Sequence, residues 1–260
     1  GSAIFTHFMA AEKATAVILR LIDFSESSSV VTFFTREYGK LAALAKGAHR
    51  HQGPFDSALD LLTRCRIVFL RKSSDGLDLL TEAKLEHRFR PPAHNLGSLF
   101  AGYYLAELLL GLTDDYDPHP VLFDVAATTL MALAHGDDVM TEVLCFELNI
   151  LRLLGHMPNL EHCVECGNSI ATEGRIAFGP LAGGVLCAGC RPGKRHVVSI
   201  SADALRALRE FSSGDVDVLQ RNKLRKSVHG EVRGILNHTI SHLLGRKPKM
   251  QDHLRFLIND

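Results

Sequence analysis

The chain has 260 residues, 46% of them hydrophobic, and equal numbers of acidic and basic side chains. It is therefore long enough for more than one folded module with a substantial core. No apolar run is long enough to span a bilayer, and no export leader is seen, so the sequence argues against a membrane or secreted protein and predicts a cytoplasmic one. Met9 begins a stretch typical of a natural start, and we expect residues 1–8 to be an addition for expression.

The balanced total hides an uneven distribution of charge. Residues 1–90 carry 13 Lys/Arg against 10 Asp/Glu, residues 91–150 carry none against 9, and residues 151–260 carry 16 against 10. Polyanions are attracted to basic surfaces and repelled by acidic ones. We therefore expect any nucleic acid to contact the two ends of the chain and to avoid the middle.

The first third of the chain has the pattern of short strands separated by turns. Five segments rich in β-branched and alternating apolar residues occur at 15–21, 29–35, 39–47, 64–72 and 77–87. A polar connection at 46–62, which leads into a short helical stretch, separates the third segment from the fourth. Three strands, a connecting element and two strands follow the order of an OB-fold, which we predict for residues 9–90.

The remaining chain has helical periodicity, interrupted once. Apolar residues recur at helical spacing in 96–112, 119–136, 139–158, 201–213 and 224–247. Ser201 is a plausible N-cap, and Arg233 is expected on the polar face of the last helix. We predict a helical bundle built from residues 91–160 and 198–260, and hence an α+β multidomain fold.

Two C-x-x-C pairs interrupt the helical pattern. Cys163 and Cys166 form the first pair, and Cys187 and Cys190 form the second. This spacing predicts an inserted four-cysteine zinc ribbon at residues 161–197. Because four thiolates leave no open coordination position, we predict one structural Zn²⁺ rather than a catalytic ion.

Other residues of similar chemistry have simpler interpretations. His156 and His162 lie close to the first pair and are alternative ligands, but surface positions in a loop are favoured. Cys65 and Cys145 stand in apolar surroundings and are predicted to be buried thiols. No nucleophile elbow, phosphate-binding loop or dinucleotide motif occurs, so the sequence does not favour an enzyme.

Basic residues concentrate in two places that fit a phosphate backbone. In the predicted barrel they include Arg36, Lys40, Lys46 and Arg50, the last two in or beside a Gly-flanked loop. A second group near the last helix includes Arg225 and Lys226. We predict DNA contact for these six residues.

The segment AVILRLIDFSESSSVVTFFTREYGKLAALAKGAHR, the barrel-to-helix order, the cysteine pairs and the ending HTISHLLGRKPKMQDHLRFL together resemble the RecO family of bacterial DNA repair proteins. The resemblance covers the chain from about Ala11 to Leu257. It implies a mediator of recombination that breaks no bonds, binds single- and double-stranded DNA, anneals complementary strands and acts with RecR to load the RecA recombinase. It also implies contact with single-strand-binding protein and a place at the nucleoid.

By position, Lys40, Lys46 and Arg50 match basic residues of the family's barrel, and the four cysteines match its zinc ligands. The chain departs from the family in two ways. After Arg50 it continues HQGP instead of a Lys/Ser-rich stretch, and residues 91–150 lack the basic residues with which some relatives hold the acidic tail of single-strand-binding protein. Arg152 is the nearest candidate for that contact.

Two alternatives of other classes stay open. One is a zinc-ribbon adaptor that binds proteins without nucleic acid, and the other is a zinc-dependent hydrolase or deacetylase. Oligonucleotide binding at two salt concentrations distinguishes the first from a DNA-binding protein.

Overall fold

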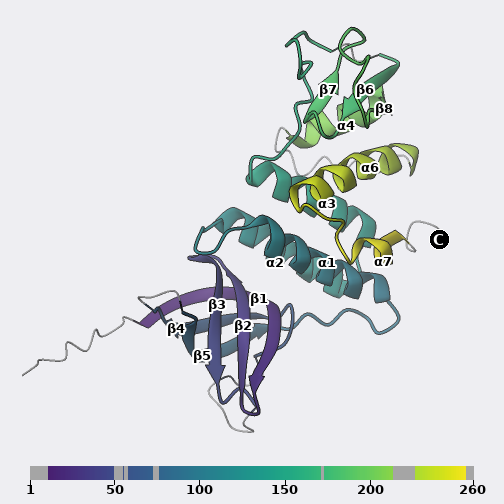
Figure 1. The fold of residues 1–260 in the computed structure, drawn as a ribbon. Helices are drawn as coiled ribbons and strands as arrows, with labels where there is room; N and C mark the ends of the chain where they lie inside the picture. The colour runs from purple at the N-terminus through teal and green to yellow at the C-terminus, as the bar shows by residue number, and fades with distance from the viewer. Residues whose placement is uncertain are drawn as a thin grey trace, which may run out of the picture. The chain divides into compact units, whose positions relative to one another are not determined.

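The computed structural model describes residues 11–49, 55, 58–72, 76–170, 173–212 and 226–255 (Figure 1). The chain divides into two compact units, with the boundary between Asp137 and Asp138. Within the described ranges, no helix is both long enough and apolar enough to cross a membrane. The finer division predicted from the sequence, at residues 90/91, 160/161 and 197/198, stays a prediction.

The first unit contains a closed five-stranded barrel with the strand order β1-β2-β3-β5-β4. Its strands are β1 (Ala11–Ser25), β2 (Ser28–Thr35), β3 (Gly39–Lys46), β4 (Arg64–Leu70) and β5 (Asp78–His87). All neighbours are antiparallel except β3 and β5, whose parallel pairing closes the barrel. The predicted OB-type barrel is confirmed.

Alternate residues of each strand fill the barrel interior. Large side chains such as Phe33, Leu41 and Phe69 are 0–1% exposed, and small ones such as Ala16 and Ala43 are fully buried among them. Cys65 belongs to this core, where burial raises the pKa of its thiol to about 12. Cys145 is also buried, so both thiols lie where the sequence predicted them.

β1 is much longer than the segment predicted at 15–21. Its first half pairs with β4 and its second half pairs with β2. The register shifts between Ile18 and Arg20 and again between Asp23 and Ser25. Such bulges bend a strand and interrupt its alternation, which explains why the sequence pattern ended too early.

Helices α1 (Leu96–Leu112) and α2 (Pro120–His135) pack together and contact β1 and β2 respectively. The Asn95 side chain accepts a hydrogen bond from the Ser98 N–H, and Gly136 ends α2 in the left-handed region at φ 84°. The described residues between β3 and β4, which are 47–49, 55 and 58–63, form turns and loop, so no part of them adopts the short helix predicted there.

The second unit combines helices with a small sheet. Its elements are α3 (Val139–Leu153), β6 (Arg175–Gly179), β7 (Gly184–Leu186), β8 (Val198–Ser201), α4 (Ala202–Ser212), α6 (Lys226–Leu243) and α7 (Gln251–Arg255). The sheet has the order β7-β6-β8, and α4 packs against α3, α6 and the sheet. The Ala204 N–H donates to the Ser201 hydroxyl at 3.1 Å, which confirms the predicted N-cap.

Arg233 lies in the interior of this unit, so the prediction that it occupies the polar face of α6 was wrong. Its side chain is 5% exposed and its Nη1 lies 3.7 Å from Oε2 of Glu147, which is fully buried on α3. A buried carboxylate on a neighbouring helix makes an arginine acceptable where the helical pattern alone expects an apolar residue.

Candidate functional site

The four predicted cysteines come together in the second unit. Their Sγ atoms all lie within 4.8 Å of one another, with Cys163 buried, Cys166 exposed, and Cys187 and Cys190 between these extremes. Cys163 and Cys166 belong to one turn, and Cys187 and Cys190 belong to the turn after β7. In the described part of the chain, this cluster is the one group of three or more side chains with the chemistry and spacing of a metal site.

The geometry of the cluster fits a tetrahedral ion. The Sγ atoms of Cys166 and Cys187 are 3.7 Å apart, close to the edge of about 3.8 Å expected for a tetrahedron with metal–sulfur bonds of about 2.3 Å. Backbone N–H groups of Cys187 and Cys166 lower the pKa of the Cys163 thiol to about 6, which favours the thiolate that a metal requires. His156 and His162 are exposed and outside the cluster, as their favoured interpretation predicted.

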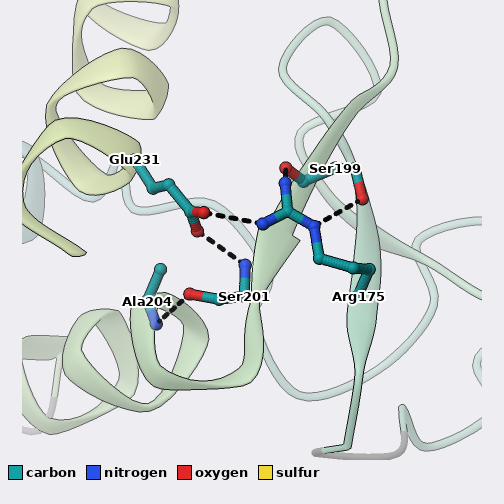
Figure 2. Close-up of polar contacts among 5 residues, drawn as sticks. All are labelled: Arg175, Ser199, Ser201, Ala204 and Glu231. Atoms are coloured by element: carbon teal, nitrogen blue, oxygen red, sulfur yellow. Dashed lines mark hydrogen bonds and ion pairs between the residues drawn. The ribbon is translucent and has the colours of Figure 1, made fainter. Parts of the chain in front are cut away.

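A polar network fastens the ribbon sheet to α6 (Figure 2). Glu231 of α6 accepts a hydrogen bond from Nη1 of Arg175 on β6 at 2.7 Å and another from the backbone N–H of Ser201 at 2.6 Å. Arg175 also donates to the hydroxyl and the carbonyl of Ser199 on β8. One carboxylate therefore connects both strands to the helix.

In the first unit, one end of the outer face of β2 and β3 is covered by the helices. Phe34 of β2 packs against Phe123 of α2 with ring centroids 6.2 Å apart. The Lys40 ammonium group donates to the carbonyl oxygens of Leu110 and Thr113 at 3.0 and 2.6 Å, at the end of α1.

The connection between α1 and α2 lies directly on β3. The Tyr116 N–H donates to the Lys40 carbonyl at 2.8 Å, and the Tyr116 hydroxyl donates to buried Asp78. A Cβ on Gly39 would lie 2.1 Å from the carbonyl oxygen of Asp117, so glycine is required for this close approach. The acidic connection at 113–117 therefore covers this end of the β2-β3 face.

The opposite end of the β1-β2-β3 face is open and apolar. Ile22, Val30, Leu44 and Leu79 lie in register across four strands, each at least partly exposed. Beyond them Phe24 is 65% exposed and lines a hollow of about 310 Å³. The other residues lining this hollow are Ser25, Ser27, Ser28, Leu44, Lys46 and Gly47. We call Ile22, Phe24, Val30, Leu44 and Leu79 the open face.

Two cations border the open face. Arg20 and Lys46 are both exposed, on β1 and at the end of β3. A nearby carboxylate, Asp23, is engaged by His49 at 3.3 Å. An exposed aromatic ring beside a cation, as with Phe24 and Lys46 here, is the combination with which OB-folds stack bases and neutralise phosphates.

The six residues predicted to contact DNA lie in different environments. Lys46 borders the open face, whereas Lys40 is bound to the end of α1 with its side chain 15% exposed. Arg36 forms a two-bonded ion pair with Asp124 of α2, at 2.9 and 3.0 Å. Arg50 and Arg225 lie outside the described residues, as does the side chain of Lys226. DNA contact stays a prediction for all six.

Arg20, Ile22 and Phe24 were not among the predicted site residues. Their spacing of two residues was a usable signal, since it continues the outward-facing row of β1 beyond residue 21. The bulges of β1 interrupt that row, which made the continuation hard to recognise.

A second cavity, of about 280 Å³, lies between the barrel and α2. Its apolar lining includes Val17, Leu62, Phe89, Ala127, Leu130, Met131 and Ala134, and its polar lining consists of Arg64, His87, Arg88, Arg90 and His135. Leu62 is held at φ 62°, an uncommon conformation for a branched residue. The cavity thus combines an apolar floor with cationic walls.

The sequence matches two family models that together cover most of the chain. Residues 9–89 match the recombination protein O N-terminal model, and residues 93–252 match the C-terminal model. A DNA repair protein RecO from Rhodopirellula baltica is 40% identical over 92% of this chain and 97% of that relative. Proteins with the same description from Anaeromyxobacter sp. (strain K) and Halalkalibacterium halodurans are 34% and 30% identical over 90% and 86% of this chain, and over 92% and 87% of their own lengths. With both halves matched and relatives aligned along nearly their whole lengths, the chain belongs to the recombination protein O (RecO) family.

Proposed function

We propose that the protein acts in DNA repair as a recombination mediator: it binds DNA, anneals complementary strands and, with RecR, helps to load RecA at the nucleoid. Family membership supports the repair role. The open face supports strand binding, because Phe24 is exposed in a hollow bordered by Lys46. This juxtaposition carries the proposal.

Annealing requires no nucleophile and no breaking of bonds. Cations reduce the repulsion between two phosphate backbones, and weak stacking holds bases without reading their sequence. Arg20 and Lys46 can contact phosphates while Phe24 and the aliphatic row contact bases. Arg36 is already paired with α2, and Lys40 is bound to the end of α1. We therefore assign the DNA strand to the open end of the barrel face and not to the covered end.

The test replaces the stacking and charged groups separately. Phe24→Ala is expected to weaken binding of a labelled single-stranded oligonucleotide by about 1–3 kcal/mol, the usual value for one stacked base. Lys46→Glu is expected to flatten the salt dependence of binding and to slow annealing, because one phosphate contact is lost. Titrations at several salt concentrations and a two-strand annealing assay measure both effects.

Lys84→Glu is the matched control. Lys84 is exposed on β5 and lies opposite Arg66 of β4 in the strand register, away from the open face. A larger loss of DNA affinity with Lys84→Glu than with Lys46→Glu would indicate that the DNA strand binds on the β4-β5 side of the barrel. Absence of oligonucleotide binding by the unaltered chain at low salt would instead favour a protein-binding adaptor.

We further propose that the cysteine cluster holds one Zn²⁺ with a structural role. Four sulfur ligands in a tetrahedron suit zinc or iron, and the family resemblance favours zinc. Cys163, Cys166, Cys187 and Cys190 would all be ligands, which leaves no position for substrate. The bound ion would stabilise a ribbon whose sheet is too small to fold alone.

The acidic tail of single-strand-binding protein has a candidate site in the cavity beside α2. Residues 91–150 lack basic side chains, but Arg64, which is paired with Glu86, lines this cavity with Arg88 and Arg90, together with Leu130 and Met131. An acidic peptide that also carries an apolar side chain would match both the cationic and the apolar lining. We propose that the cationic residues of this contact come from β4 and the segment after β5.

A synthetic acidic peptide that carries one apolar side chain tests this contact. Arg90→Gln and Met131→Asp are each expected to weaken its binding at least severalfold in an anisotropy titration, because one loses a cation and the other places a carboxylate in the apolar floor. Lys84→Gln, which removes an exposed cation of β5 outside the cavity, should leave the affinity unchanged. Equal weakening by all three variants would indicate attraction by overall charge alone.

A further inference from the structure

The loop that follows the second cysteine pair is a distinct feature of the ribbon. Residues Arg191–His196, here called the knuckle loop, connect Cys190 to β8, and all six are exposed. The backbone N–H groups of Cys190 and Arg191 both donate to the Cys187 carbonyl at 3.1 Å. The loop is therefore fixed at its start by the metal-binding turn and at its end by the sheet.

The knuckle loop is positively charged and contains no acidic residue. Arg191, Lys194, Arg195 and His196 are four of its six residues. Lys194 forms an ion pair with Glu165 of the first cysteine turn at 2.7 Å. Arg191 and Arg195 make no ion pair with any described residue, so their guanidinium groups face solvent uncompensated.

Several other basic side chains of the same unit are neutralised by carboxylates. Arg206 pairs with Asp203, Arg209 with Glu161, and Arg175 with Glu231. Lys247 pairs with Asp252. Compared with these pairs, the knuckle loop leaves its positive charge available to a partner.

The loop offers the chemistry of phosphate recognition and little else. Pro192 is its one apolar residue and His196 its one aromatic ring, and it contains no Phe, Tyr or Trp. Arginine guanidinium groups bind phosphate oxygens with two parallel hydrogen bonds. The Arg175–Glu231–Ser201 network holds β8, so the cations are presented on a fixed frame (Figure 2).

We propose that the knuckle loop is a second DNA contact, which binds the phosphate backbone through Arg191 and Arg195 without base recognition. This inference rests on the proposed DNA-binding function, and it adds a surface in the compact unit that does not contain the barrel. A protein that anneals must hold two strands, and two separate phosphate-binding surfaces provide for both. The ribbon is then a DNA-binding element as well as a metal-stabilised one.

A purely structural role predicts something different. Four thiolates around a divalent ion carry a net negative charge, and nearby arginines could serve only to offset it. In that case, neutralising the arginines weakens metal retention and leaves DNA binding unchanged. Metal content and DNA affinity are therefore measured on the same samples.

The experiment uses the full metal-loaded chain and a labelled single-stranded oligonucleotide. R191Q/R195Q is expected to reduce the slope of log affinity against log salt by about 1.4, because each phosphate contact on a single strand contributes about 0.7. The unaltered chain then loses about sevenfold more affinity than the variant between about 50 and 200 mM salt. R206Q, which breaks an exposed pair in the same unit, is the control and should keep the slope.

An unchanged slope in R191Q/R195Q, with metal content and melting temperature like those of the unaltered chain, overturns the inference. If the double variant loses metal, the single variant R195Q is used instead, because Arg195 is further along the chain from Cys190. A salt slope lowered by about 0.7 in R195Q supports the contact, and an unchanged slope refutes it. Loss of affinity in the Phe24 and Lys46 variants but not in R191Q/R195Q refutes the knuckle contact alone. Absence of any DNA binding by the unaltered chain refutes the proposed function as well.

Discussion

Lys40 illustrates how a basic residue near a candidate binding surface can be committed to the fold. Its ammonium group has the carbonyl oxygens of Leu110 and Thr113 and a carboxylate oxygen of Asp115 within 3.4 Å. These carbonyls lie at the end of α1, where backbone oxygens lack helical partners and a cation is favourable. A strand residue thus caps a helix that is distant in sequence.

Replacement of Lys40 by alanine should therefore reduce stability. The change leaves two helix-end carbonyls without their donor, and we expect the free energy of unfolding to fall by about 1–3 kcal/mol in urea titrations. Lys46→Ala, at the exposed end of the same strand, should stay within about 0.5 kcal/mol of the unaltered chain. Normal stability combined with lost DNA affinity in Lys40→Ala would show that this lysine contacts DNA instead.

At the scale of elements, the ribbon depends on the cysteine cluster and on Glu231. The sheet has strands of 5, 3 and 4 residues, which bury little surface by themselves. The cluster holds the two cysteine turns together, and Glu231 joins β6 and β8 to α6. Loss of either connection should loosen the ribbon while the barrel persists.

Metal removal tests the first connection. We expect about one equivalent of zinc per chain by elemental analysis, and a chelator should lower the melting temperature of the ribbon-containing unit by several degrees in calorimetry. Cys166→Ser should lose the metal, whereas Cys65→Ala, which alters a thiol in the barrel core, should retain it. An unaltered melting profile after complete chelation would argue against a structural ion.

The pH dependence of stability tests the second connection. Burial raises the pKa of Glu231, but hydrogen bonds from Ser201 and the ion pair with Arg175 outweigh it and leave the pKa below its ordinary value of 4.5. The stabilisation is therefore present above pH 4.5 and is lost as the pH falls through the lower folded-state pKa. Glu231→Gln should cost on the order of 1–2 kcal/mol at pH 7, and the difference from the unaltered chain should shrink on acidification.

Asp203→Asn is the matched control for this pH series, because Asp203 and Arg206 form an exposed pair on α4. Such pairs contribute little, so its effect should stay within about 0.5 kcal/mol at every pH. If the difference in unfolding free energy between Glu231→Gln and the unaltered chain stays the same in acid, the charge of the Glu231 carboxylate does not stabilise the ribbon.

The sequence predicted elements well where local patterns dominate. Strand alternation and turn residues indicated the barrel order, and the two C-x-x-C pairs indicated which thiols meet. The pattern could not reveal that Lys40 reaches the end of α1, that Arg36 pairs with Asp124, or that Arg233 is buried against Glu147. These partners lie far apart in sequence, and only tertiary packing decides whether a cation faces solvent or a carboxylate. Candidate DNA contacts were therefore less predictable than metal ligands.

On the scale of the whole molecule, charge separates by position in the chain. Residues 91–150 contain nine acidic and no basic side chains, whereas the candidate DNA contacts lie in the flanking parts. Part of this acidic middle, at 113–117, covers one end of the β2-β3 face. The acidic connection at 113–117 should repel a polyanion, whereas Lys46 and the knuckle loop should attract it. Electrostatics should therefore direct a polyanion to the same surfaces that the fold leaves uncovered.

The acidic connection fastened over Gly39 also limits how far a strand can run along the barrel. On the proposed path, a nucleotide chain that enters beside Phe24 would meet this acidic connection after it crosses Ile22, Val30, Leu44 and Leu79, and would have to turn outward there. Affinity should consequently level off at short oligonucleotide lengths. The bases beyond that turn would then leave the protein surface unstacked, with their pairing edges exposed to an incoming complement.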